Sequence, residues 1–175
     1  MRVLRWMGGA LLWGVAILGV LSGAVFLAHL AGWVQPLVVV SGSMQPDIRQ
    51  GDLLIAVPVA AADVDIGEVA TLPSTVTGTL VTHRVIAVSR DDSAYVIEMA
   101  GDANRANDPE PYRVDAEATV LQPLLTIPAA GDVVLVLARP AVAIPLAVAV
   151  LALIALSLVP ATSAARDPAS VEEPA

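Results

Sequence analysis

The chain of 175 residues contains no cysteine and no lysine, and only 3% of its residues are aromatic. Without cysteine it has no disulfides, no thiolate nucleophile and no cysteine-based zinc or iron–sulfur site. All nine basic residues are arginines, so mechanisms that need a lysine base or a Schiff base are excluded. We therefore expect neither a metal ion nor a cofactor.

Charged residues are also scarce, at 15% of the chain, whereas hydrophobic residues reach 57% and the mean hydropathy is +0.76. Soluble proteins typically contain about 25% charged and about 45–50% apolar residues. The formal net charge is −8, and the arginines form no cluster. Nucleic acid is not an expected partner, because neutralising its phosphates requires grouped basic side chains.

Two uncharged runs, at residues 6–46 and 140–165, lie near the two ends of the chain. Residues 9–30 would form a helix of about 33 Å, enough to cross a bilayer core of about 30 Å, and residues 140–160 predict a second span. A cleavable signal peptide is the alternative at the N-terminus. Its apolar segment would measure about 7–15 residues and end at a small-residue cleavage site, whereas this run is longer and no clear site follows it.

The predicted organisation has two spans around one domain. Arg2, Arg5 and Arg166 flank the spans and predict that both termini are cytoplasmic. The expected parts are a cytoplasmic N-terminus at 1–8, spans at 9–30 and 140–160, an extracytoplasmic domain at 31–139, and a disordered cytoplasmic tail at 161–175. This predicts a two-span protein of the cell membrane. From Asp47 to Asp132 the domain holds 14 acidic residues against 5 arginines, a net charge of −9.

Short β-branched or alternating runs fill the region between the spans, separated by Gly, Pro and Asp clusters about every ten residues. They cover residues 37–40, 53–57, 69–72, 79–88, 95–99 and 118–127. No segment there has the pattern of an amphipathic helix. The sequence therefore predicts an all-β domain that rests on the membrane and is flanked by two transmembrane α-helices.

Three short segments of this domain carry side chains suited to catalysis. Ser41 and Ser43 flank a glycine after an apolar strand, where a tight turn can expose a hydroxyl and aim backbone N–H groups at one point. His83, the only histidine outside the predicted spans, lies within a strand pattern, and Asp102 and Asp108 belong to a turn-forming segment. Taken singly, each segment is also compatible with a role outside catalysis: an ordinary loop, a structural histidine, or a solvated turn or weak cation site.

Taken together, the three segments resemble the type I signal peptidases in order and content. The resemblance is to the branch found in the endoplasmic reticulum, in archaea and in some Gram-positive bacteria, which uses serine, histidine and aspartate. It covers residues 37–139 and both spans. The motifs are S-x-S-M-x-P at 41–46, Gly51-Asp52, His83-Arg84 and the G-D-x-N box that leads to Asp108. Members of the other branch carry a catalytic lysine where this chain has His83.

The resemblance implies a signal-peptidase-like catalytic fold and assigns roles to single residues. Ser43 corresponds to the nucleophile, His83 to the general base and Asp108 to the acid of the triad. Ser41 corresponds to the hydroxyl that joins the backbone N–H of Ser43 in an oxyanion hole. The role of Asp102 stays open: it shares the triad role, organises the loop, or holds His83 or the neighbouring arginine in place.

The implied substrates are signal peptides of exported preproteins, with the lipid bilayer as a second partner and the protein export channel as a further candidate. The substrate would add as an extended strand between the segments that precede the serine and the histidine, with walls at Val38, Val39, Val40, Val81 and Thr82. Departures from the family pattern at Gln45, Asp47 and Ala103 bear on substrate preference.

Three rival functions share some of these features. A signal peptidase restricted to a few exported subunits shares every feature above, and a catalytically silent membrane assembly factor would share the fold. A self-cleaving repressor-type peptidase fits poorly, because that class uses lysine and is soluble.

Overall fold

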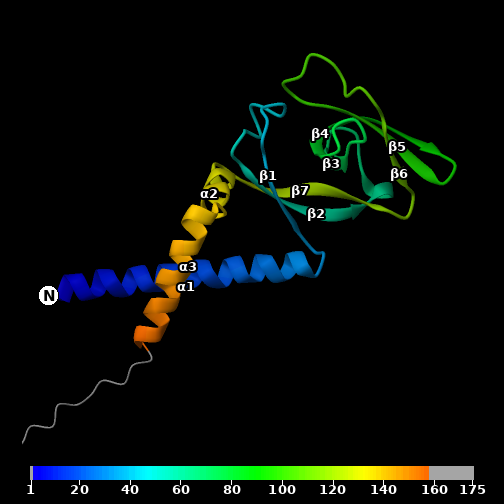
Figure 1. The fold of residues 1–175 in the computed structure, drawn as a ribbon. Coiled ribbons are helices and arrows are strands. Elements are labelled where there is room, and N and C mark those ends of the chain that lie inside the picture. The colour runs from blue at the N-terminus through cyan, green and yellow to red at the C-terminus, as the bar shows by residue number, and fades with distance from the viewer. Residues whose placement is uncertain (1, 158–175) are drawn as a thin grey trace, which may run out of the picture. The chain divides into compact units, whose positions relative to one another are not determined.

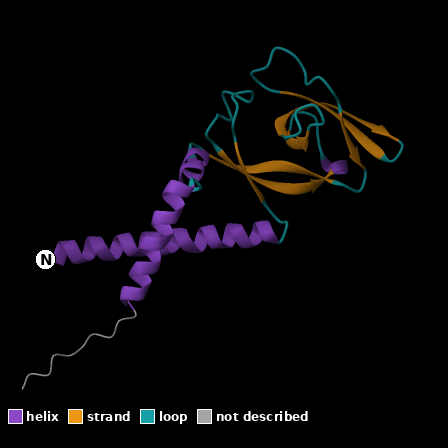
Figure 2. Cartoon of the chain, in the orientation of Figure 1, coloured by secondary structure: helices purple, strands orange, loops and turns teal. Residues whose placement is uncertain are grey.

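The computed structural model describes residues 2–157 (Figures 1 and 2). The elements, in chain order, are α1 (Arg2–Leu30), β1 (Gln35–Val38), β2 (Leu53–Ala60), a short 3-10 helix η1 (Ala61–Asp63), β3 (Val69–Pro73), β4 (Leu80–Asp91), β5 (Ala94–Ala100), β6 (Tyr112–Asp115), β7 (Thr119–Ile127), α2 (Ala130–Leu137) and α3 (Pro140–Ser157). The chain divides into two compact units, Met1–Val134 and Leu135–Ala175. The sheet and the site described below belong to the first.

All seven strands form one antiparallel sheet in the order β1-β2-β7-β3-β4-β5-β6, which curls into a half-barrel (Figure 1). β1 is a terminal strand of this sheet and pairs with β2 alone. The first part of β4 pairs with β3, and its pairing with β5 begins only at Arg84. Within the described residues, the sheet thus leaves one side of β1 and one side of β4 at residues 80–83 outside its ladders.

Two clusters of buried apolar side chains stabilise the domain. The larger includes Leu72 of β3, Val85 of β4, and Ile97 and Met99 of β5. The smaller contains Met44, Ile48 and Leu54, and Leu37, Val39 and Val69 pack against it. Fully burying side chains of this size contributes about 1.5–3 kcal/mol each, so even the small cluster holds its part of the chain firmly. That part includes the turn with the candidate serine.

Asp52 ties the end of that turn to the connection between β7 and α2. Its buried carboxylate accepts the backbone N–H of Arg49 at 2.8 Å and that of Ala129 at 3.0 Å. These backbone hydrogen bonds, that from Arg49 foremost, hold the pKa of Asp52 below its usual value. Gly51 has a φ of +92°, a backbone conformation that strains residues with a Cβ, so glycine is favoured at this turn.

The predicted β domain is confirmed in part: it contains an antiparallel sheet of seven strands, but three elements inside it, η1, β6 and α2, were missed. Each of the six predicted runs contains or overlaps a strand; β1, at Gln35–Val38, begins two residues before its run. The missed β6 has only four residues, and its exposed Arg113 and Asp115 give it the composition of a loop. The all-β expectation was wrong at η1, which has three residues, and at α2, whose eight valine-rich residues are too few to reveal a helical period.

The helices outside the sheet agree in part with the predicted spans. α1 ends at Leu30, as expected, but begins at Arg2, and α3 begins at Pro140 with Pro145 inside it. By length and hydropathy, no single helix of the described residues qualifies as a membrane span, whereas a bent pair, Ala130–Leu137 with Pro140–Ala152, qualifies on those grounds alone. The two spans stay predictions. The predicted tail at 161–175 and the last residues of the second span lie outside the described part of the chain.

Candidate active site

Ser43 lies in a tight turn that follows β1 and is anchored on both sides. Met44 and Ile48 are buried in the smaller apolar cluster, so the backbone on the C-terminal side of Ser43 is fixed by packing. The Ser43 hydroxyl itself stays partly accessible, and the Ser41 hydroxyl lies 3.2 Å from it. The turn therefore presents two neighbouring hydroxyls on a rigid base.

His83 comes from β4 and faces this turn. Its Nε2 lies 3.0 Å from the Ser43 hydroxyl oxygen, although the two residues are 40 positions apart in the chain. Side chains on a strand alternate between faces, so His83 shares its face with the buried Val85, while Thr82 on the other face contacts Thr71, with their hydroxyls 2.8 Å apart. With 9% of its surface exposed, His83 is held by the sheet and still reaches the cavity beside it.

Asp108 meets the opposite edge of the imidazole. The Nδ1 of His83 lies 2.7 Å from one carboxylate oxygen of Asp108 and 2.8 Å from the other. The backbone N–H of Asp108 donates to the carbonyl of Met99 at 2.9 Å, which brings the loop back to the end of β5. A carboxylate can only accept, so Nδ1 carries the hydrogen and Nε2 is left to accept the proton of Ser43.

Asp102 does not contact His83 by hydrogen bond. Its two carboxylate oxygens accept from Nε and Nη2 of Arg84, at 2.8 and 2.5 Å, and Arg84 also donates from Nη1 to the carbonyl of Gly67 at 2.8 Å. The hydrogen bonds from Arg84 hold the pKa of Asp102 below its usual value, so this carboxylate stays charged. Of the roles left open for Asp102, the geometry matches the one that holds the arginine beside His83.

The loop that starts with Asp102 also holds the backbone of the serine. The N–H of Ala103 donates to the Ser43 carbonyl at 2.8 Å. Gly101, just before it, approaches the same carbonyl so closely that a Cβ there would lie 2.7 Å from the oxygen. Loop 101–108 therefore positions two members of the site at once: its first residues hold the turn of Ser43, and its last supplies Asp108.

We expect Gly101→Ala to disturb the site through this close approach. The added methyl would meet the Ser43 carbonyl at 2.7 Å and the Asn104 side chain at 2.6 Å. Asn104 can swing aside, but the carbonyl belongs to the turn that carries the hydroxyl, so the turn must move. Overpacking of this kind destabilises a fold by about 1–3 kcal/mol.

The measurements for Gly101→Ala are the thermal unfolding midpoint and the rate at which Ser43 reacts with a fluorophosphonate, a probe of activated serines. Both should fall. Gly19→Ala in α1, where a Cβ meets nothing within 4 Å, is the matched control and should lower neither, because alanine is a better helix former than glycine. An unchanged reaction rate in Gly101→Ala would show that the close approach is unimportant.

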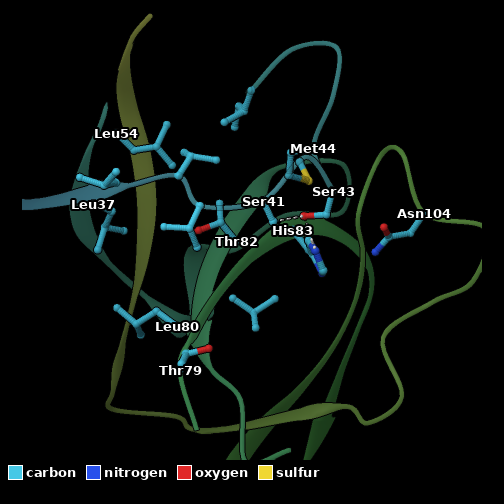
Figure 3. A pocket seen from close by; sticks show the side chains of 15 residues that line it. Leu37, Ser41, Ser43, Met44, Leu54, Thr79, Leu80, Thr82, His83 and Asn104 are labelled. Carbon is cyan, nitrogen blue, oxygen red and sulfur yellow. Dashed lines mark hydrogen bonds between the residues drawn. The ribbon is translucent and has the colours of Figure 1, made fainter. Parts of the chain in front are cut away.

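An elongated cavity of about 390 Å³ opens beside the serine and the histidine (Figure 3). Figure 3 shows Ser43 and His83 together at its wall, with Asn104 on the side away from Leu37. All five residues predicted to contact a substrate lie along it, namely Val38, Val39, Val40, Val81 and Thr82. One wall comes from β1 and the residues that follow it, and the other from the start of β4. β1, and β4 at residues 80–83, each have a side that the described sheet leaves unpaired.

Tyr112, at the start of β6, is a member of the site that the sequence did not reveal. Its hydroxyl donates to Oδ2 of Asp108 at 2.9 Å, and its ring is 6% exposed within the larger apolar cluster. Burial, followed by the hydrogen bond to Asp108, raises the pKa of Tyr112, so it stays protonated and remains a donor. Its position four residues after Asp108 was the available signal, but only the path of the loop turns the hydroxyl toward the carboxylate.

The chemistry of this arrangement is that of an activated serine. A hydroxyl becomes an effective nucleophile when an adjacent imidazole takes its proton, and a carboxylate on the far side of the ring fixes the tautomer and stabilises the charged form. Ser43, His83 and Asp108 have these contacts in this order. Among residues 2–157 no group of three His, Asp or Glu side chains is placed to hold a metal ion.

A scan of the chain against models of known protein families finds no match, and a search of curated proteins finds none either.

Proposed function

We propose that this chain is a membrane-bound serine endopeptidase, a signal peptidase that removes N-terminal signal peptides from exported preproteins. One observation carries the proposal: a serine, a histidine and an aspartate are linked by hydrogen bonds, and the serine and the histidine lie at the wall of a largely apolar cavity. The His83 imidazole takes the proton of Ser43 as the hydroxyl attacks the peptide carbonyl. It then gives the proton to the leaving amine, and a water molecule releases the acyl group.

Two further groups support the roles around the serine. The Ser41 hydroxyl lies 3.2 Å from the Ser43 hydroxyl, close to the place where the carbonyl oxygen of a substrate would become negative. With the Ser43 proton engaged by His83, Ser41 is the donor of this pair. We propose that Ser41 and the backbone N–H of Ser43 form the oxyanion hole, because fixed donors aimed at developing charge stabilise the transition state.

The cavity suits a substrate that binds as an extended strand. One wall continues from β1 and the other is the start of β4, and each has a side that is not paired in the described sheet. A peptide between them would make main-chain hydrogen bonds to both, and we propose that the valine side chains of the walls form shallow apolar pockets that select small side chains. Signal peptides carry small residues at the cleavage site, after an apolar segment.

The chain also suits a substrate that emerges from a bilayer. α1 ends at Leu30, and the wall formed by residues 37–40 begins seven residues later. We propose that α1 and the bent pair at the C-terminal side anchor the chain in the cell membrane, with the sheet on the extracytoplasmic face. The lipid bilayer, the signal peptide and the protein export channel are then the partners of the domain.

The direct test is to place the purified full chain in lipid vesicles with a model preprotein and to follow the shortened product by mass spectrometry. We expect one cut, at the end of the signal peptide and after a small residue. If the wild-type chain leaves the preprotein intact while its Ser43 reacts with a fluorophosphonate, the proposed substrate class is wrong and the proposed serine chemistry stands.

Narrowing the cavity should hinder cleavage even after a small residue. We expect Val39→Phe and Val81→Phe each to lower the rate of cleavage after alanine by at least about tenfold, because the ring would fill the space where a substrate side chain lies. Val76→Phe, at an exposed position outside this cavity, is the matched control and should cleave normally. Normal cleavage by both cavity variants, with unchanged unfolding midpoints, would refute this placement of the substrate.

A further inference from the structure

The contact between His83 and Asp108 leaves the carboxylate free to rotate. Nδ1 lies at nearly equal distances from its two oxygens, 2.7 and 2.8 Å, so the imidazole alone does not select between them. Tyr112 breaks this equivalence, because its hydroxyl donates to Oδ2 at 2.9 Å. A carboxylate with one oxygen occupied in this way has a fixed plane.

The hydroxyl of Tyr112 is held where it is by the core. The ring belongs to the larger apolar cluster and pairs through its backbone with Ile97 of β5, and the side chain of Asp108 is 5% exposed. Neither partner can therefore turn to bulk water without disturbing packed residues. A hydrogen bond between buried groups, one of them charged, is stronger than one at the surface.

The other acidic groups near this pair are engaged elsewhere. The Glu110 carboxylate accepts from Ser74, Thr75 and the N–H of Val76, at the turn between β3 and β4. On the far side of His83, the charge of Asp102 is paired with Arg84. Arg105 lines the cavity that borders Asp108 and Tyr112, and no acidic side chain of the described residues forms an ion pair with it.

We infer that Tyr112 is a positioning residue of this site: its hydroxyl fixes the plane of the Asp108 carboxylate and thereby the orientation and basicity of His83. The inference rests on the proposed serine chemistry and adds a fourth member to the chain of hydrogen bonds. Tyr112 contacts neither Ser43 nor the cavity proposed for the substrate, so it acts only through Asp108.

Removal of the Tyr112 hydroxyl should change both the reaction rate and its dependence on pH, each in a predictable direction. The carboxylate loses its fixed plane, so His83 spends less time aligned with Ser43 and the rate falls. The charge on Asp108 is also less neutralised, so it stabilises the charged form of the imidazole more strongly. The acid limb of the pH–rate profile, which reports the base of the free enzyme, must then move to higher pH.

The test compares Tyr112→Phe with Tyr95→Phe in the full chain in vesicles. Tyr95 is the other tyrosine of the protein; it lies on β5, and its ring faces Arg90, 5.9 Å away, instead of the triad. For each variant, the rate of reaction of Ser43 with a fluorophosphonate and the cleavage of a model preprotein are measured from pH 5 to pH 9. Thermal unfolding is followed in parallel.

We expect Tyr112→Phe to lower the maximal rate of both reactions about tenfold, equivalent to about 1.4 kcal/mol in activation free energy, and to move the acid limb upward. Tyr95→Phe should change neither. A pH–rate profile of Tyr112→Phe that superimposes on that of the wild type overturns the inference. A lower rate with an unshifted acid limb and a reduced unfolding midpoint also overturns it, because that combination indicates a purely structural role.

Failure of the proposed function gives a different result. If wild-type Ser43 does not react with the fluorophosphonate, the serine chemistry and the inference fall together. If it reacts but the preprotein stays intact, the proposed substrate is wrong, and the pH profile of the fluorophosphonate reaction still decides the role of Tyr112.

Discussion

Replacing Ser43 with alanine is expected to lower the cleavage of a preprotein by a factor on the order of 10⁴ to 10⁶, because the acyl-enzyme cannot form without the hydroxyl. His83→Ala should lose about as much, since the hydroxyl is a weak nucleophile without its base. The fold should be unaffected by the serine change, because Met44 and Ile48, which anchor the turn, are untouched. The measurement is product formation under single-turnover conditions, together with the unfolding midpoint.

The double variant Ser43→Ala with His83→Ala sharpens this test. Residues that act as one unit are not additive, so the double variant should be no slower than either single one. Ser93→Ala, in the exposed turn between β4 and β5, is the matched serine control and should retain full activity. Full activity in Ser43→Ala would refute the proposed mechanism outright, and a double variant much slower than both would mean that the two residues act independently.

The second prediction with a large expected effect distinguishes the roles of Asp102 and Asp108. Asp108→Asn is expected to lower kcat by about 10³- to 10⁴-fold, because an amide can donate to Nδ1 and so favour the wrong tautomer of His83. Asp102→Asn should cost about tenfold or less, since Asp102 contacts Arg84 and not the imidazole. Both changes keep the size of the side chain, so packing is matched between them.

The comparison of Asp102→Asn with Asp108→Asn is informative because the two acids lie only six residues apart in one loop and carry the same charge. Measuring kcat and KM for each variant, with the unfolding midpoint, separates a chemical from a structural loss. A larger loss in Asp102→Asn than in Asp108→Asn would reverse the roles proposed for them. Equal losses with equal destabilisation would mean that the loop tolerates neither change.

The sequence predicted the sheet well because its strands follow the expected alternation. It failed where an element was too short for its period to appear, as in the four residues of β6 and the eight of α2. The predicted site residues are brought together by pairing over long distances: β3 pairs Ala70 with His83, and the turn of Ser43 packs against Leu54. The order of the motifs along the chain could suggest that these residues lie together, but it could not give the distances between their side chains.

The roles of Asp102 and Asp108 could not be separated in the sequence, since either lies within reach of His83 along a flexible loop. The separation comes from two backbone hydrogen bonds, Ala103 to the Ser43 carbonyl and Asp108 to the Met99 carbonyl, which give the loop its path. The same path turns Tyr112 toward the carboxylate. Side-chain contacts that depend on the course of an irregular loop carry no periodic signal in the sequence.

The unpaired side of β1 also has a consequence for the behaviour of the protein in solution. An open strand edge beside an apolar groove is a template on which the strand of another molecule can add, and proteins usually block such edges. Here the edge must stay open if a substrate is to pair with it. The net charge of −9 between Asp47 and Asp132 supplies the alternative protection, because copies of the domain repel one another before their edges can meet. The acidity of the domain thus serves to keep an unblocked edge from self-association and aggregation.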